Sequence, residues 1–271
     1  MADLDSYIKQ LKETFPLRKP VLRSAIRQLQ IPLGARVLDA GCGIGQPALL
    51  LADEVGPAGH VTAIDRCGTF LIHAGQIAKN ADLSDRISFR EGDLKELPFD
   101  NHQFDWAWSA DCAGYPSVGE PLPLLKELSR VVKPGGGIAV IAWSSQNLLP
   151  GYPLLEARLN VTSSSIEQHM MAKSPESAFL RALGWFRETG LEEVEAQTFV
   201  GNVCAPLDDE IRAALLSFFH MLWGESQSRV SKEDWKEYRR LCLPESADFL
   251  LNLTDYYGFF TYSMFHGKVP K

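Results

Sequence analysis

The chain has 271 residues and a formal net charge of −7, from 27 Lys and Arg against 34 Asp and Glu. Because a nucleic-acid partner calls for a basic patch, this balance argues against nucleic acid as a substrate. Hydrophobic residues make up 45% of the sequence, yet no run approaches the roughly 18 apolar residues of an integral membrane segment. Five irregularly spaced cysteines argue against a disulfide framework and against a metal site, so we expect a reduced, cytoplasmic protein.

Residues 1–31 predict an N-terminal helical cover. Apolar residues recur there at helical spacing, while Pro16 and Pro20 predict a division into two short helices. We expect a second domain over 32–271, into which two segments rich in helical patterns are inserted as caps, at about 144–174 and 207–253.

From residue 35 onward, predicted strands alternate with predicted helices. This alternation is typical of a parallel sheet with helices on both faces, an α/β fold. Strands are predicted over 35–40, 60–65, 87–91, 104–110, 138–143, 192–200 and 256–265, and helices over 47–54, 69–80, 121–132, 154–159, 166–171 and 177–188. The glycines at 135–137 predict a turn that ends the helix over 121–132.

The first predicted strand runs into a glycine-rich turn, Val37-Leu-Asp-Ala-Gly-Cys-Gly-Ile-Gly-Gln46. Glycine lets a backbone approach a ligand closely, and the helix that follows presents free N–H groups. Counted from Gly41, the next glycines follow after two and four residues. The dinucleotide fingerprint has them after two and five, so an NAD-dependent dehydrogenase is disfavoured. The turn predicts a site for an adenosine-containing ligand.

The second predicted strand ends in an acid, Asp65, which lies 20 residues beyond Gly45. A carboxylate at this distance can accept hydrogen bonds from both hydroxyls of a ribose. Asp65 could equally cap the helix that starts near Gly68, and the two roles are compatible.

The turn, with Asp39 ahead of it, resembles motif I of the class I S-adenosylmethionine (SAM) methyltransferases. Three further stretches resemble the same family, and the likeness extends from about Pro32 to Trp143. They are Gly92-Asp-Leu94, Leu97-Pro-Phe99 and Leu128-Ser-Arg-Val-Val-Lys-Pro-Gly-Gly136. The resemblance implies a Rossmann-like seven-stranded methyltransferase sheet of order 3-2-1-4-5-7-6, with strand 7 antiparallel.

The resemblance also implies S-adenosyl-L-methionine as the cofactor. Asp93 would accept a hydrogen bond from the exocyclic amine of adenine, and the Leu94 amide would serve a ring nitrogen. The cofactor-binding residues that it implies are Asp39, Gly41, Cys42, Gly43, Gly45, Gln46, Asp65, Arg66, Gly92, Asp93, Leu94, Ser109 and Ala110.

A member of this family would transfer a methyl group to carbon, oxygen or nitrogen of a small organic acceptor and give S-adenosylhomocysteine. The likeness is greatest to the branch that methylates quinones and sterols. An acceptor of high pKa needs a general base, for which Asp111 and His169 are the candidates. Tyr115 and Trp143 are candidates for contacting the acceptor.

Two alternatives remain open at this point. Cys112 occupies a position that resembles a cysteine of arsenite methyltransferases, and arsenite would need Cys67, Cys204 or Cys242 to converge with it. A buried cysteine usually behaves as a small hydrophobe instead. The second alternative is a protein that binds SAM without catalysis.

Overall fold

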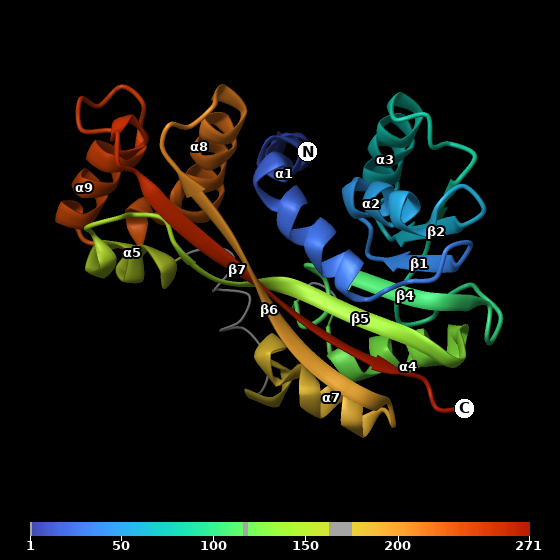
Figure 1. Cartoon of the computed structure of the whole chain (residues 1–271). Coiled ribbons are helices and arrows are strands. Elements are labelled where there is room, and N and C mark those ends of the chain that lie inside the picture. The colour runs from blue at the N-terminus through green and yellow to red at the C-terminus, as the bar shows by residue number, and fades with distance from the viewer. Residues whose placement is uncertain (1, 116–118, 163–174) are drawn as a thin grey trace. The chain divides into compact units, whose positions relative to one another are not determined.

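The computed structural model describes residues 2–115, 119–162 and 175–271 (Figure 1). Its strands form one seven-stranded sheet of order β3-β2-β1-β4-β5-β7-β6. Neighbouring strands from β3 to β5 run parallel. The strands are β1 (Arg36–Ala40), β2 (His60–Asp65), β3 (Ile87–Glu91), β4 (Phe104–Ala110), β5 (Val132–Asn147), β6 (Glu192–Cys204) and β7 (Tyr257–Lys268).

Strand β7 is antiparallel to β5. Near the start of β5, the Gly135 N–H donates to the Val269 carbonyl just beyond β7, at 2.8 Å. Towards the end of β5, the Ser144 and Thr261 hydroxyls are hydrogen-bonded at 2.8 Å. Residue numbers therefore rise along β5 as they fall along β7. The predicted strand order and the reversed seventh strand are confirmed.

Helices lie on both faces of the sheet, α2 and α3 on one face and α4 and α7 on the other (Figure 1). None of the helices in the described part of the chain is long and apolar enough to cross a membrane. The α-helices are α1 (Ala2–Gln28), α2 (Gln46–Val55), α3 (Gly68–Asn80), α4 (Pro121–Val131), α5 (Pro153–Asn160), α7 (Ala182–Glu188), α8 (Asp209–Trp223) and α9 (Lys232–Cys242).

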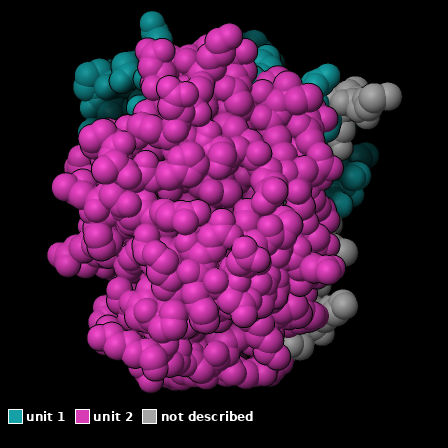
Figure 2. Space-filling view, turned by 90° about the vertical axis from the view of Figure 1, so that its right-hand side faces the viewer, with its two compact units in different colours: residues 1–21, 143–171, 200–262 teal, residues 22–142, 172–199, 263–271 magenta. Residues whose placement is uncertain are grey.

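The chain divides into two compact units, which Figure 2 distinguishes by colour. Unit 1 comprises 1–21, 143–171 and 200–262, and unit 2 comprises 22–142, 172–199 and 263–271. Most of both expected insertions therefore falls in unit 1, which contains α5, α8 and α9. The strands β1 to β4, with α2, α3, α4 and α7, belong to unit 2.

The core of unit 2 determines which way the residues of β1 face. Leu38 and Ala40 belong to one buried cluster together with Leu124 and Leu128 of α4. Because successive side chains of a strand point to opposite faces, Asp39 points away from this cluster. The carboxyl group of Asp39 thus lies near the end of β1, a central strand, on the face of the sheet that also carries α2 and α3.

Helix α1 is continuous, so the predicted division at Pro16 and Pro20 is wrong. Each proline lacks the N–H of one helical hydrogen bond. Around them, however, Leu17, Val21 and Leu22 are at most 5% exposed. Burying such side chains contributes about 1.5–3 kcal/mol each, which offsets the lost hydrogen bonds.

The predicted turn at 135–137 is instead part of β5. Phe104 pairs with Val132, but Trp106 pairs with Gly137, so β5 bulges outward between these two positions. Gly135 has φ 78°, a left-handed conformation that favours glycine. The glycines therefore bend a strand here rather than end a helix.

The helix predicted over 177–188 is shorter than expected. Two single-turn 3-10 helices, Pro175–Ser177 and Phe179–Arg181, precede α7. The helix predicted over 154–159 is confirmed as α5, whereas the one over 166–171 lies outside the described residues.

Candidate ligand site of unit 2

Most of the predicted ligand-binding residues follow four neighbouring strands of unit 2. Because these strands are parallel, their carboxyl ends lie at one edge of the sheet, where open α/β sheets bind ligands. The stretch 39–46 runs from the end of β1 into α2, Asp65 ends β2 and Arg66 follows it, 92–94 follow β3, and 109–111 run past the end of β4.

Backbone hydrogen bonds join the glycine-rich turn to the end of β2. The N–H groups of Gly41 and Cys42 both donate to the Ile64 carbonyl, at 2.9 and 3.0 Å. The Gly43 N–H donates to Oδ2 of Asp65 at 2.9 Å. The turn and the acidic end of β2 are thus a single hydrogen-bonded structure.

The three glycines of the turn serve two different purposes. All have positive φ, of 79°, 51° and 79° in chain order. A Cβ on Gly41 would lie 2.4 Å from Sγ of Cys112, and one on Gly45 would lie 2.8 Å from Cβ of Ala74. A Cβ on Gly43 would meet no atom within 4 Å. Packing therefore requires the outer two glycines, whereas Gly43 borders open space.

Asp65 uses both carboxylate oxygens within the protein. Besides the bond from Gly43, its Oδ1 accepts from the Cys67 N–H at 2.9 Å. Cys67 is itself the N-cap of α3, so Asp65 stabilises the turn before the helix and does not cap it. A carboxylate offers about four acceptor positions, so two remain for a ligand. Arg66, next to it, is exposed.

Asp39 is a fully buried carboxyl group that has no hydrogen-bond partner within the described structure. Its exposed fraction is 0%, and neither oxygen accepts a bond. Burial, and to a smaller extent the charge of Asp65, raises the pKa of Asp39 to about 8. Unpartnered buried groups of shifted pKa are concentrated at ligand sites. A cation bound beside Asp39 would provide the missing partner.

The turn after β3 presents a second acid. The Gly92 N–H donates to the Asp65 carbonyl at 3.1 Å. Asp93 is exposed, and its Oδ1 accepts from the Lys95 N–H at 2.9 Å. The Leu94 side chain is 7% exposed and joins the core cluster of unit 2. This turn therefore pairs an accessible carboxylate with a backbone anchored by an apolar side chain.

The end of β4 carries a backbone irregularity. Asp111 has φ 49°, unusual for a residue with a side chain, and its N–H donates to the Ile141 carbonyl at 2.8 Å. Ser109, two residues earlier, is fully buried, and the partly buried Tyr115 packs against the core cluster. Irregular backbone of this kind is concentrated at functional sites.

Two buried thiols of unit 2, those of Cys42 and Cys112, are held in their neutral form. Burial raises the pKa of the Cys112 thiol to about 12, and it also raises the pKa of Cys42. The thiolate is the form that binds soft metals, and burial disfavours that form at both residues. No group of three His, Cys, Asp or Glu in the described ranges is arranged to hold a metal ion.

Two other candidates are not among the described residues of unit 2. Trp143 belongs to unit 1, where its ring is 7% exposed and stacks on Phe260 at 4.5 Å. Its indole N–H donates to Oε1 of Gln146. These contacts account for Trp143 as a core residue of unit 1. His169 lies outside the described residues.

Two contributors to the site were not predicted from the sequence. Sγ of Cys112 lies against Gly41, and the Cys67 amide holds Asp65. A backbone amide leaves no signal in a sequence. For Cys112, the only available signal was its position just after a predicted strand that ends at the ligand-binding edge.

A family model described as a methyltransferase domain matches residues 37–136. A demethylmenaquinone methyltransferase of Listeria welshimeri is 32% identical over 139 residues, which are 51% of this chain and 57% of that protein. The match thus covers little more than half of that relative's length. A demethylmenaquinone methyltransferase of Staphylococcus aureus is 30% identical over 207 residues, covering 71% of this chain and 82% of that protein.

Among solved structures, phosphoethanolamine N-methyltransferase 2 of Haemonchus contortus, in complex with SAM, has a TM-score of 0.54 at 18% identity. The similarity covers 92% of this chain and 52% of that one, and it supports the fold. The glycine-rich turn, the strand order and the similarity to the Staphylococcus protein over 71% of this chain all indicate the same family. The chain belongs to the class I family of SAM-dependent methyltransferases.

Proposed function

We propose that the chain transfers a methyl group from SAM to carbon, oxygen or nitrogen of a small organic acceptor and releases S-adenosylhomocysteine. The observation that carries this proposal is the unpartnered carboxyl of Asp39. The aminoacyl end of SAM has an ammonium group, and a buried charge is stable only beside an opposite charge or hydrogen-bond partners. In this proposal the ammonium is the missing partner of Asp39.

The remaining residues at the strand ends fit the nucleoside part of SAM. Asp65 keeps acceptor positions for ribose hydroxyls after binding Gly43 and Cys67. The exposed carboxylate of Asp93 suits the exocyclic amine of adenine. Open space beside Gly43 allows close approach to the backbone. These features are the support for the cofactor-binding set predicted from the sequence.

When bound, SAM supplies an electrophilic methyl group. The chain's own contribution is to orient the acceptor and to accept its proton. We assign Asp111 as the proposed base, because it follows the strand β4 at the ligand-binding edge and has a strained backbone. Tyr115, four residues further on, is proposed to orient the acceptor.

The names of the relatives favour one class of acceptor. The Listeria and Staphylococcus proteins are demethylmenaquinone methyltransferases, so we rank a reduced quinone ring first among acceptors for this chain. Phenols and amines follow. This order extends the small-molecule assignment and determines which compounds are screened first.

Calorimetric titration with SAM and with S-adenosylhomocysteine tests the proposal. We expect micromolar binding of both compounds and none of NAD, followed by transfer of tritiated methyl to a member of the acceptor series. Failure of a folded sample to bind either compound would contradict the cofactor assignment. Binding without turnover on any acceptor would instead favour the non-catalytic alternative.

Replacing Asp65 with alanine should remove the preference for a ribose with free hydroxyls. Each hydrogen bond to a charged group contributes about 1.5–3 kcal/mol, so affinity for S-adenosylhomocysteine should fall about tenfold or more. The loss should be much smaller for the 2′,3′-dideoxy analogue, because that ligand lacks both donors. Asp85→Ala, at an exposed site, is the control. An equal loss for both ligands would mean that Asp65 acts only by holding the turn.

A further inference from the structure

We propose that Glu127 and Arg130 of α4 are positioning residues for adenine recognition. They hold the segment after Asp93 and Leu94, the two residues proposed to contact the base, so the inference rests on the proposed function. Both belong to the stretch 127–136, most of which resembles the family. Neither residue has a part in cofactor contact or in the chemistry described above.

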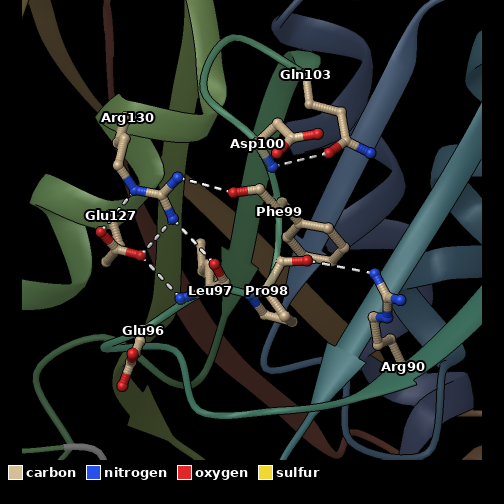
Figure 3. A pocket seen from close by; sticks show the side chains of 9 residues that line it. All are labelled: Arg90, Glu96, Leu97, Pro98, Phe99, Asp100, Gln103, Glu127 and Arg130. Atoms are coloured by element: carbon tan, nitrogen blue, oxygen red, sulfur yellow. Dashed lines mark hydrogen bonds and ion pairs between the residues drawn. The ribbon is translucent and has the colours of Figure 1, made fainter.

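Arg130 uses all five N–H donors of its guanidinium group. Two of its bonds go to backbone carbonyls, from Nη2 to Leu97 at 2.9 Å and from Nη1 to Phe99 at 2.8 Å. A third goes from Nη1 to Oδ1 of Asn101 at 3.1 Å. The last two go to Glu127, from Nε at 2.9 Å and from Nη2 at 2.7 Å. Figure 3 shows the guanidinium lying between Glu127 and residues 97–99, which belong to the segment that connects β3 to β4.

Glu127 binds the backbone of Leu97 as well, and we call Glu127 and Arg130 together the clamp. Oε2 of Glu127 accepts from the Leu97 N–H at 2.8 Å, so the backbone of Leu97 is held through both its N–H and its carbonyl. The hydrogen bond from Arg130 holds the pKa of Glu127 below its usual value. The side chains are 19% exposed for Glu127 and 32% for Arg130. The pair therefore stays ionised at neutral pH and is partly accessible to water.

The clamp fixes one end of the turn that carries Asp93 and Leu94. The other end is fixed by the bond from the Gly92 N–H to the Asp65 carbonyl. Within the turn, the Asp93 carbonyl accepts from the Glu96 N–H at 3.2 Å. Only 93–96 lie between the two anchors. Moving Leu97 would consequently move the Asp93 carboxylate and the Leu94 amide.

The preference of the protein for adenine over hypoxanthine in the ligand measures this positioning, and a ratio of two affinities does not depend on the stability of the variant. In the proposed site, Asp93 accepts a hydrogen bond from the exocyclic amine of adenine. Hypoxanthine has a carbonyl oxygen in that place, which would face the carboxylate without a shared proton. Leaving a charged group unpaired costs more than about tenfold in affinity, so the wild type should bind S-adenosylhomocysteine at least about tenfold more tightly than S-inosylhomocysteine.

Replacing Arg130 with alanine should reduce this selectivity ratio to below about threefold, because the turn loses its anchor while the base contacts remain chemically present. Arg130→Lys keeps the charge but cannot reproduce the planar, five-donor arrangement, so it should not restore the ratio. Glu127→Gln provides a second, milder test, since it retains an oxygen for Leu97 but loses the ion pair. Both ligands are titrated by calorimetry at a temperature where each variant is folded.

Arg90→Ala is the matched control. Arg90 lines the same surface pocket and contacts the same segment, but through one hydrogen bond of 3.3 Å to the Pro98 carbonyl and a cation–π contact of 5.6 Å with the Phe99 ring. In Arg90→Ala, the ratio of the affinities for S-adenosylhomocysteine and S-inosylhomocysteine should equal that of the wild type.

A ratio that is preserved in both Arg130→Lys and Glu127→Gln would overturn the positioning role. A wild type that binds both ligands equally would overturn it as well. If the folded wild type binds neither ligand, the proposed function fails first. If Arg130→Ala does not fold, the two milder variants decide the question.

Discussion

Replacing Gly43 with valine is expected to abolish binding of SAM while the protein stays folded. A Cβ at this position would meet no protein atom within 4 Å. The added side chain would instead occupy the space through which a ligand approaches the backbone. We expect affinity to fall by roughly 100-fold or more, equivalent to about 3 kcal/mol.

The cost to folding should be limited. The backbone of residue 43 has φ 51°, and a side chain in this region costs about 1–2 kcal/mol. Gly190→Val is the matched control, because Gly190 also has positive φ, 77°, and open space around it, but lies between α7 and β6. Thermal unfolding should show similar losses of stability for the two variants, whereas calorimetry should show a loss of binding for Gly43→Val alone. Wild-type affinity in Gly43→Val would place the ligand away from this turn.

The neighbouring glycines should behave differently from Gly43. A Cβ on Gly41 or Gly45 would collide with Cys112 or Ala74, so those positions affect packing as well as binding. All three glycines belong to one recognisable motif. Only the three-dimensional structure separates the one that borders open space from the two that are enclosed.

The order of the strands followed from the family resemblance, whereas the alternation of strands and helices was predictable because each local signal agreed with the global fold. The β strands of unit 2 alternate with helices, and the glycine-rich turn lies where a parallel sheet binds ligands. The predictions that failed are those in which tertiary packing outweighs a local preference. Helix α1 retains Pro16 and Pro20 because its apolar residues are buried, and the glycines at 135–137 bend β5 instead of ending α4.

Candidate site residues can be recognised in the sequence where they belong to a motif and act through their side chains. The partition into two units was not predictable, because unit 1 is assembled from three separate stretches of sequence. The clamp of Glu127 and Arg130 is a further example. The sequence shows an acid and a base three residues apart, but it does not show that the same guanidinium binds the carbonyls of Leu97 and Phe99.

Replacing Asp39 with asparagine is expected to stabilise the free protein at alkaline pH relative to the wild type, and to weaken SAM binding. In the unfolded chain this carboxyl loses its proton near its ordinary pKa of 3.8, whereas burial raises its pKa to about 8 in the folded chain. Between these values the unfolded state binds fewer protons. The ionisation of Asp39 therefore lowers the free energy of unfolding of the wild type as pH rises from about 4 to about 8, with a slope approaching 1.4 kcal/mol per pH unit.

Asparagine has nearly the same shape and cannot ionise. In urea unfolding without ligand, we expect the stability of the variant relative to the wild type to rise by about 3–4 kcal/mol between pH 5 and pH 8. Taking the difference between variant and wild type at each pH removes the contributions of other groups. An unchanged difference between pH 5 and pH 8 would contradict the raised pKa of Asp39.

Binding should show the opposite effect of the same substitution. If the ammonium of SAM is the partner of Asp39, binding must remove the carboxyl proton, and the wild type should release roughly one proton per SAM at pH 7. Calorimetry in buffers of different ionisation enthalpy measures this number. Asp39→Asn should lose most of the release and bind SAM about tenfold or more weakly. Equal affinity with unchanged proton release would show that the ammonium lies elsewhere. A gain in stability coupled to a loss of affinity would show that Asp39 is retained for the ligand, at the expense of the free fold.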